Sequence, residues 1–373
     1  MKQIIKLFKR IMIFIIGLII VLAVGIAIFI NVAPQFGQVP QGEDLERVKK
    51  SEHFEDGVFV NLIETKMDIP LSKIPGMMWG FLSPGENKSP SKSLPTEFNH
   101  QANTAPDSTA LITWYGHSAV LLKIDGKVIL IDPMLGPAAS PVSFMTNRFN
   151  YEEPIDLKEI PKVDAIIISH DHYDHLDYPS IVELKDKTDH FFTALGVGSH
   201  LEKWGVDKEA ITELDWWQDV EYQGLKFTAA PARHFSGRGI LDRNKTQWAS
   251  WAVQGKKQNI YFSGDGGYGP HFKEIGEKLG PFDFAMMECG QYNKMWEAIH
   301  MMPEQSVQAG IDVQGKILMP IHWGAFDLSL HTWTDPVQRF TKEAKRLKVE
   351  YTTPVIGKEF NVAVQQPQQY WWE

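Results

Sequence analysis

Three histidines and three aspartates lie within eight consecutive residues in the middle of the chain. This segment, residues 170–177, reads HDHYDHLD and directly follows the apolar run VDAIIIS. Neutral imidazole and carboxylate groups are the usual nitrogen and oxygen ligands of Zn²⁺. In a turn that leaves a strand, His170 and His172 can face one metal ion while Asp174 and His175 face another. The alternative is a solvated acidic loop that binds nothing, and the density of ligand groups argues against it.

Three further ligand-type side chains each end an apolar, strand-like run far along the chain. His234 ends KFTAAPARH, Asp265 ends IYFSGD and His322 ends ILMPIH. An isolated histidine is more often a structural hydrogen-bonding group than a metal ligand, so none of these residues is decisive alone. Three of them at equivalent strand ends favour one shared site, because loops at strand ends converge on the binding sites of α/β folds.

The elements that must position these residues alternate between strands and helices. Residues 110–133 read as two strands with a turn at Asp125-Gly126, and a strand is expected before each ligand above. The mostly apolar, β-branched run over 163–169 is typical of a strand buried on both faces. This alternation indicates an α/β fold. Helices are expected over residues 178–184, 198–204, 272–279, 303–312 and 336–347.

Residues 11–30 form an uninterrupted apolar stretch, IMIFIIGLIIVLAVGIAIFI. A helix of this length spans roughly 30 Å, the thickness of the hydrocarbon core of a bilayer. A cleaved signal peptide is the alternative, but its apolar region usually runs only about 7–15 residues. Four basic residues precede the stretch, and none follows it before Arg47. The positive-inside rule therefore predicts a single-pass membrane protein with a cytoplasmic N-terminus and an extracytoplasmic main domain, in the periplasm or at the cell surface.

Composition shifts divide the chain into six expected segments. Residues 83–108 are rich in Ser, Pro and Asn, and we expect an irregular loop there. The segments are a cytoplasmic N-terminus (1–10), a transmembrane anchor (11–31), a linker (32–57), an N-terminal extension packing on the domain (58–108), the main domain (109–365) and a tail (366–373).

Charge and cysteine content exclude some classes of protein. Lys and Arg total 37 against 46 for Asp and Glu, a formal charge of -9, so electrostatics give no help in binding nucleic acids. The single cysteine, Cys289, excludes an intramolecular disulfide and any multi-cysteine zinc site. We expect Cys289 to be a buried packing residue and not a nucleophile.

The ordered ligand set resembles that of the metallo-β-lactamase superfamily. Longer blocks, among them WYGHSAVLLKIDGKVILIDP, PARHFSGRG, YFSGDGGYGPHF and PIHWGAFDLSLHTWTDP, resemble one branch of it, the N-acyl-phosphatidylethanolamine-hydrolysing phospholipases D and their bacterial relatives. The resemblance covers roughly residues 108–360. It implies an αββα sandwich with a dinuclear metal site, here preceded by one transmembrane helix.

The resemblance also implies a metal-ligand set and a cofactor. Two Zn²⁺ per chain are expected, and Asp174 and Asp265 are expected to take part in catalysis as well as in binding the metals. Asp132, in LIDP, is expected to orient a ligand histidine, although a turn aspartate is the alternative. The implied ligands are His170, His172 and His234 for one ion, Asp174, His175 and His322 for the other, and Asp265 as the bridge between them.

The same resemblance implies four residues that contact the substrate. His300 is expected to polarise the scissile group or protonate the leaving group, and His331 to close the pocket over the head group. Helix capping or packing is the alternative for both histidines. Gln291 and Tyr292 are expected to hydrogen-bond the substrate.

Together, these features predict a membrane-tethered, zinc-dependent hydrolase. We expect a phosphodiesterase of phospholipase D type that cleaves N-acyl-phosphatidylethanolamine-like phospholipids by means of a metal-bridging hydroxide. The expected partner is a membrane phospholipid and not a nucleic acid. Whether the chain forms a homodimer is left open. A lactonase or amidase acting on a small soluble substrate stays open too. The intact ligand set argues against a non-catalytic binding protein, and the charge of -9 argues against a nuclease.

Overall fold

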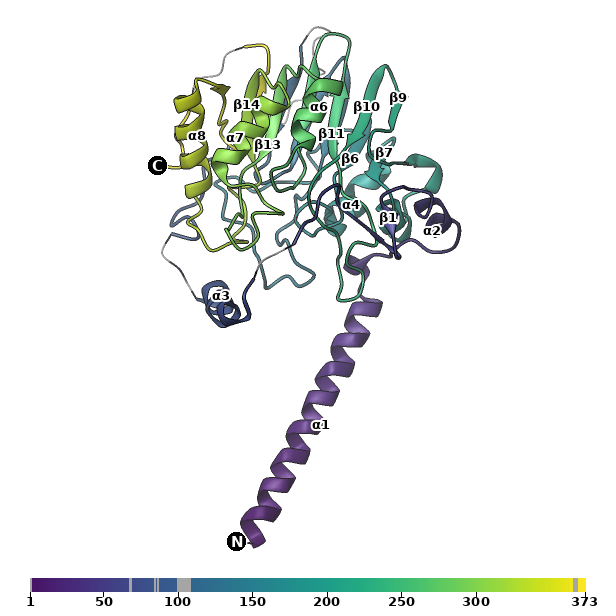
Figure 1. Ribbon diagram of the computed structural model, residues 1–373, viewed down its shortest axis with the longest axis vertical. Coiled ribbons are helices and arrows are strands. Elements are labelled where there is room, and N and C mark those ends of the chain that lie inside the picture. The colour runs from purple at the N-terminus through teal and green to yellow at the C-terminus, as the bar shows by residue number, and fades with distance from the viewer. Residues whose placement is uncertain (1, 67–68, 84, 86, 99–108, 365–367) are drawn as a thin grey trace.

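In the computed structural model, one long helix projects from an α/β body built on two mixed sheets (Figure 1). The structure describes residues 2–66, 69–83, 85, 87–98, 109–364 and 368–373. Residues 99–108, in the loop expected over 83–108, and residues 366–367, at the start of the expected tail, lie outside the described residues.

The first sheet joins an antiparallel half to a parallel half. Strands β16, β3, β4 and β5 pair antiparallel, whereas β5 to β8 pair parallel. The parallel half contains the apolar run AIII, which is buried as a strand between two covered faces should be. In spatial order the strands are β16 (Glu359–Asn361), β3 (Leu111–Trp114), β4 (Val120–Ile124), β5 (Lys127–Ile131), β6 (Ala165–Ile168), β7 (Phe191–Ala194) and β8 (Ile211–Leu214).

The second sheet repeats this plan. Strands β9 to β12 pair antiparallel, and β12 to β15 pair parallel. In spatial order the strands are β15 (Glu350–Tyr351), β14 (Ile317–Ile321), β13 (Phe284–Glu288), β12 (Asn259–Phe262), β11 (Ser250–Gln254), β10 (Leu225–Ala230) and β9 (Asp219–Tyr222).

Aromatic side chains join the two sheets, and helices cover their outer faces. Phe192 stacks on Phe227 with ring centroids 4.5 Å apart, and Phe284 meets Phe360 at 5.7 Å. Helices α6, α7 and α8 bury a second apolar cluster against the second sheet, and α5 packs on β8 of the first. The expected αββα sandwich is confirmed. Its helices are α4 (Tyr178–Leu184), α5 (Gly198–Lys203), α6 (His271–Leu279), α7 (Pro303–Asp312) and α8 (Asp335–Leu347).

Residues 110–133 differ from the two strands expected there, because they form three. The turn at Asp125-Gly126 separates β4 from β5 as predicted, but a second reversal separates β3 from β4. Gly116 and His117 adopt φ angles of 86° and 54°, a left-handed conformation that ends an extended run. The apolar pattern continues through this reversal, so periodicity alone does not reveal it.

The projecting helix α1 (Lys2–Val32) is longer than the expected span of residues 11–31. Its segment Gln3–Val32 is long and apolar enough to cross a membrane, a test that an N-terminal signal sequence also passes. None of the side chains in its most apolar stretch is buried inside the protein. Its apolar side chains therefore have no protein partner along most of its length.

The segment after α1, expected to be a linker, packs on the domain instead. The indole of Trp204 donates a 2.7 Å hydrogen bond to the carbonyl of Pro34, and Val48 is fully buried. Scattered Gly and Pro suggest a flexible segment, but composition does not show which side chains pack on the domain. The segment contains η1 (Pro34–Phe36), α2 (Gly42–Val48) and β1 (Phe54–Glu55), and β2 (Val58–Phe59) follows it at the start of the expected extension.

A further short helix, α3 (Ile74–Leu82), lies in the expected N-terminal extension and projects beside the body (Figure 1). The remaining elements are single turns of 3₁₀ helix, namely η2 (Leu71–Lys73), η3 (Lys185–Lys187) and η4 (Lys208–Ala210).

Candidate metal centre

The predicted ligands follow the carboxyl ends of strands from both sheets. His170 follows β6 in the first sheet, while His234, Asp265 and His322 follow β10, β12 and β14 in the second. Strands β10, β12 and β14 run in the same direction, so their carboxyl ends share one edge. The strand ends of both sheets thus bring residues more than 150 positions apart to one place.

Three histidines form the first group of converging ligand atoms. Nδ1 of His172 lies 2.9 Å from Nε2 of His170 and 3.2 Å from Nε2 of His234. All three nitrogens fall within one cluster of the size that a single metal ion requires. The structure therefore brings together the side chains expected to hold the first ion.

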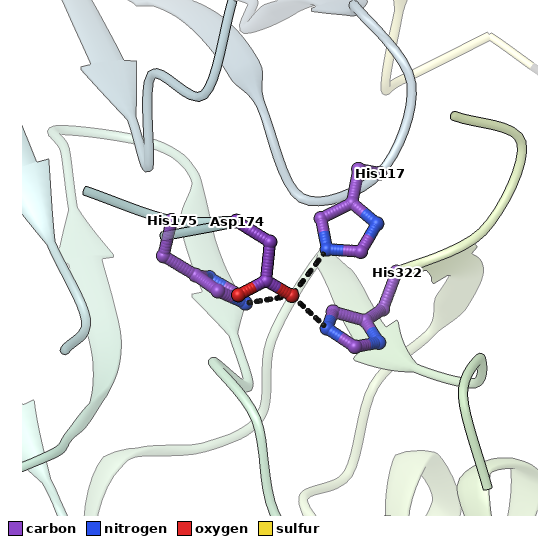
Figure 2. A group of neighbouring side chains, drawn as sticks. All are labelled: His117, Asp174, His175 and His322. Carbon is purple, nitrogen blue, oxygen red and sulfur yellow. Dashed lines mark hydrogen bonds and ion pairs between the residues drawn. The ribbon is translucent and has the colours of Figure 1, made fainter. Parts of the chain in front are cut away.

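The second group surrounds the carboxylate of Asp174 (Figure 2). Its Oδ2 lies 3.2 Å from Nε2 of His322 and 3.7 Å from Nε2 of His175. A fourth side chain, His117, places its Nε2 2.9 Å from the same oxygen. The three expected ligands of the second ion thus also converge, together with a histidine that the sequence reasoning did not select.

Asp265 connects the two groups. Its Oδ2 lies 3.1 Å from Nε2 of His175 and 2.9 Å from Nε2 of His322 in the second group. The same oxygen lies 3.9 Å from Nε2 of His170 and 3.8 Å from Nε2 of His234 in the first. Among the described residues, Oδ1 of Asp265 is a buried atom without a hydrogen-bond partner. A carboxylate placed between two histidine groups, with one oxygen unsatisfied, is suited to bridging two cations.

Outer hydrogen bonds fix the orientation of the ligand rings. Nδ1 of His175 donates to Asp132 Oδ2 at 2.7 Å, which is the orienting contact expected of Asp132. Nδ1 of His234 donates to the carbonyl of Ile299 at 2.9 Å. Nδ1 of His170 lies 2.9 Å from the hydroxyl of Ser169. Such bonds at one ring nitrogen direct the other nitrogen toward the metal position.

The protonation states of the cluster also suit a cation. Burial, reinforced by neighbouring histidines, holds the pKa of His170 and of His234 well below the usual value, so both rings present a lone pair. Burial opposes protonation of His322 as well, but Asp265 and Asp174 outweigh it and raise its pKa to about 10. In the metal-free protein, the proton on His322 therefore balances negative charge on Asp174 and Asp265. Bound cations would supply that positive charge instead. The donor set therefore fits divalent metal ions.

Solvent reaches the cluster from one side. The side chains of His170, His175, His234, Asp265 and His322 are at most 3% exposed. Asp174 and His300 are 16% and 14% exposed, and His172 is also only partly buried. A substrate must approach where these partly exposed groups lie.

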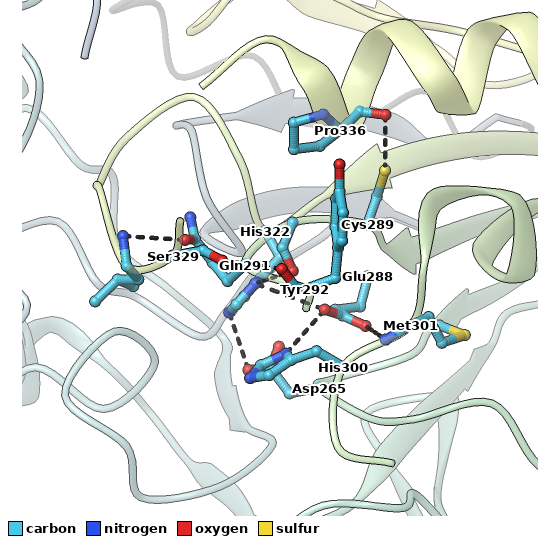
Figure 3. A network of polar contacts seen from close by, with 12 residues as sticks. Asp265, Glu288, Cys289, Gln291, Tyr292, His300, Met301, His322, Ser329 and Pro336 are labelled. Carbon is cyan, nitrogen blue, oxygen red and sulfur yellow. Dashed lines mark hydrogen bonds and ion pairs between the residues drawn. The ribbon is translucent and has the colours of Figure 1, made fainter. Parts of the chain in front are cut away.

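His300 borders the metal cluster and is held by a buried acid. Its ring centroid lies 5.1 Å from that of His234 and 5.3 Å from that of His322. Its Nδ1 donates to Glu288 Oε1 at 2.9 Å, and the second oxygen of Glu288 accepts from the backbone N–H of Met301 (Figure 3). Burial raises the pKa of Glu288, and His300 opposes that rise. Sequence reasoning missed Glu288, which lies inside the apolar run FAMMECG.

The other expected substrate residues are tied to the protein itself. Gln291 is buried, and its side-chain oxygen accepts from the backbone N–H of Leu328 at 3.0 Å. Tyr292 is also buried; its hydroxyl contacts Asp335, and its ring stacks on His331 (Figure 3 shows Gln291 and Tyr292). His331 lines a small pocket with Gln291 and Trp323. Burial lowers the pKa of His331 to about 4, and its Nε2 is buried with no hydrogen-bond partner among the described residues.

His117 is the main residue of the cluster that sequence reasoning missed. Burial, with His322 nearby, lowers its pKa to about 3, so a neutral ring donates from Nε2 to Asp174. Its backbone also joins the two sheets, because the carbonyl of His117 accepts from the N–H of His322 at 2.8 Å. The signal available in the sequence was the pair Gly116-His117, a turn with a ligand-type side chain between two apolar runs.

Four residues in or beside the cluster have a strained backbone. His117, Asp132, Gln291 and His322 adopt φ angles of 54°, 42°, 63° and 70°. Residues other than glycine rarely adopt this left-handed conformation, and such strain gathers at functional sites. The surrounding hydrogen bonds therefore hold these side chains in positions that the local sequence disfavours.

Comparison with known proteins places the chain in a family. Residues 127–323 match the family described as the β-lactamase superfamily domain. The chain is 37% identical over 329 residues to an uncharacterized protein of Mycobacterium tuberculosis, a match that covers 87% of this chain and 88% of that protein. It is 31% identical over 257 residues to N-acyl-phosphatidylethanolamine-hydrolyzing phospholipase D 1 of Caenorhabditis elegans, covering 66% of this chain and 72% of that enzyme.

A solved structure shares the fold. Igni18, described as a novel metallo hydrolase from the archaeon Ignicoccus hospitalis, superposes with a TM-score of 0.53 at 20% identity. The match covers 68% of this chain and 98% of Igni18. At this level of identity, the likeness concerns the fold alone.

Proposed function

This chain belongs to the metallo-β-lactamase superfamily as a metal-dependent hydrolase, and from that premise we propose that it is a membrane-tethered, zinc-dependent phosphodiesterase of phospholipase D type. The proposed substrate is a phospholipid of the N-acyl-phosphatidylethanolamine class. Water adds to phosphorus, the bond from phosphorus to the head-group oxygen breaks, and phosphatidic acid and an N-acylethanolamine are released.

The observation that carries the proposal is the position of Asp265 between two groups of three ligand side chains. In the proposed site, His170, His172 and His234 hold one Zn²⁺, and Asp174, His175 and His322 hold the other. Asp265 approaches the histidines of both groups within 4 Å, which supports a dinuclear site. Paired divalent cations supply a nucleophilic water of lowered pKa and stabilise negative charge on phosphoryl oxygens.

The protein's own residues contribute proton transfer and orientation. We assign His300 as the proton donor to the leaving alcohol, because it is a partly exposed imidazole beside the cluster. Glu288 accepts from Nδ1 of His300 and so fixes the direction of the ring. His331, Gln291 and Tyr292 remain proposed head-group contacts, acting through the small pocket beside the cluster.

The lipid substrate is supported by the worm relative and by α1. In this proposal α1 stays in the membrane as an anchor, with the N-terminus in the cytoplasm and the catalytic domain on the extracytoplasmic side. Tethering raises the effective concentration of the enzyme at lipid head groups. An anchored domain and a phospholipid substrate therefore support each other.

The proposal is tested with the full chain in vesicles that contain N-acyl-phosphatidylethanolamine, with products identified by mass spectrometry. We expect phosphatidic acid and N-acylethanolamine in equal amounts, and no product from Asp265→Asn. A panel of lactones and amides is assayed in parallel. Turnover of a lactone or amide without cleavage of any phosphodiester would reject the phospholipase assignment in favour of the other hydrolase chemistry.

A further inference from the structure

In the described part of the folded body, large apolar side chains that are more than 70% exposed lie in three segments. Ile240 and Leu241 are 71% and 91% exposed at the tip of one loop, and Phe144 is 78% exposed at the tip of another. In and beside α3, Trp79 is 72% exposed and Leu71 is 83% exposed. Scattered exposed apolar residues are normal in a soluble domain, but groups of them mark a binding surface.

The two loops meet at the point where α1 enters the body. The side chain of Gln35 donates to the carbonyl of Pro141 at 2.7 Å, and its own carbonyl accepts from Nη2 of Arg238 at 2.8 Å. Gln35 lies just after the end of α1 at Val32. The residues that follow the helix are thus bonded to both loops, close to the chain positions of Phe144 and Ile240.

Helix α3 extends the same end of the molecule. Figure 1 shows α3 at the end of the body from which α1 emerges. Its sequence, IPGMMWGFL, has no charged or strongly polar side chain, so it has no face suited to water. Phe81 stacks on Trp296, with ring centroids 6.3 Å apart, which joins the helix to the loop that carries His300.

The metal cluster lies behind this end. Tyr173, between His172 and Asp174, donates to the carbonyl of Arg238 at 2.8 Å, and its ring meets that of Phe36 at 6.2 Å. Phe36 in turn meets Phe29 within α1 at 5.5 Å. A chain of contacts thus runs from the helix through the loops to the segment that carries the ligands.

We propose that this end of the domain rests on the lipid bilayer that holds α1. The docking surface comprises Phe144 and Met145, Ile240 and Leu241, and Leu71, Met78 and Trp79. A bilayer is the occupant because a helix long enough to span it leaves the body between the two loops, and because Trp and short apolar helices favour the membrane interface. Lipid is then presented directly to the partly exposed edge of the cluster. The inference rests on the proposed anchor but not on the proposed reaction.

Depth-dependent fluorescence quenching tests this surface in the full chain. Single cysteines are introduced as Phe144→Cys, Leu241→Cys and Trp79→Cys and labelled with an environment-sensitive fluorophore, since the native Cys289 is buried. Each protein is reconstituted in phosphatidylethanolamine–phosphatidylglycerol vesicles that contain a lipid brominated either near its head group or near the end of its acyl chains. Val21→Cys within α1 is the positive control, and Lys257→Cys, in the turn after β11 at the opposite strand ends, is the negative control.

We expect quenching at all three surface positions at least about three-fold above that at position 257, because an interfacial segment reaches the acyl boundary. Quenching at position 21 without quenching at positions 144, 241 and 79 would overturn the docking surface and leave the anchor intact. Blue-shifted emission without quenching at these positions would assign the surface to a second copy of the chain and overturn the proposal. No quenching even at position 21 would reject the anchor and the surface together.

Discussion

At the scale of single residues, Asp265 is the group that would couple the two cations of the proposed site. Its Oδ2 lies within 4 Å of histidine Nε2 atoms from both groups. The rings of His170, His175 and His234 are oriented by hydrogen bonds from outside the cluster, so their metal-facing nitrogens do not depend on Asp265 for direction. Two roles are therefore separate. Outer hydrogen-bonding groups orient the histidine rings, and the carboxylate of Asp265 lies between the two histidine groups.

We predict that His117→Ala weakens zinc binding at the Asp174 group about 10–100-fold, because the variant loses the hydrogen bond that orients this carboxylate. His190→Ala, which removes a partly buried histidine just before β7 and away from the cluster, is the matched control. A competition titration with a chromophoric chelator measures both affinities. Equal zinc affinity in His117→Ala and the wild type would show that Asp174 needs no orienting donor.

We predict that Glu288→Gln lowers kcat about ten-fold while both metal ions remain bound. The substitution replaces the acceptor of Nδ1 of His300 with an amide that can donate, so the ring loses its fixed orientation. Steady-state kinetics and metal analysis of the same preparation check this. Loss of zinc in this variant would instead assign Glu288 to the support of His322, whose Nδ1 lies 3.8 Å away.

At the scale of elements, two sheets with the same plan present their parallel halves at one edge. The contact between them at the site is made by backbone, where the hairpin turn at His117 pairs with the segment after β14. Gly290 lies in this contact, and an added Cβ would come 1.8 Å from the carbonyl oxygen of His322. The position of a metal ligand therefore depends on the absence of a side chain in a neighbouring loop.

We predict that Gly290→Ala lowers the free energy of unfolding by about 1–3 kcal/mol and reduces zinc occupancy, because the backbone of His322 must move. Gly76→Ala is the control, since no atom lies within 4 Å of an added Cβ there. Denaturant unfolding and metal analysis measure the two effects. Full zinc occupancy in Gly290→Ala would show that the loop absorbs the methyl group elsewhere.

Much of this architecture is predictable because its signals are local. Helix α4 begins and ends where the sequence predicted, since Asp177 caps it and Pro179 suits its first turn. The ligands at 170–175, 234, 265 and 322 were found because each follows an apolar run. His117 and Glu288 were not selected because their roles come from pairing with Asp174 and His300, which are distant in sequence. The packing of residues 33–57 is likewise a tertiary effect that composition does not record.

At the scale of the whole molecule, the segment after α1 fixes this helix relative to the site. His200 accepts from the backbone N–H of Gln38 at 3.0 Å and contacts Asp171, which lies between two ligands, at 3.2 Å. Because this segment is packed and not flexible, the cluster keeps a defined direction relative to α1. Such a molecule is suited to a substrate that arrives in the plane of the membrane.

We predict that a chain beginning at Ala33 hydrolyses soluble bis-p-nitrophenyl phosphate at the rate of the full protein, but cleaves phospholipid in vesicles about 10²-fold more slowly. The anchor contributes effective concentration and no catalytic group. Parallel assays on the two substrates measure the difference. Equal loss on both substrates would mean that α1 supports the fold of the site.

The most direct test of the dinuclear site is metal analysis of the active full chain, combined with removal and restoration of metal. We expect two equivalents of zinc per chain, loss of phosphodiester hydrolysis on chelation, and recovery when zinc is added back. In Asp265→Asn we expect the zinc content to fall along with activity. Full activity in a preparation with no bound transition metal would show that the proposed site is wrong.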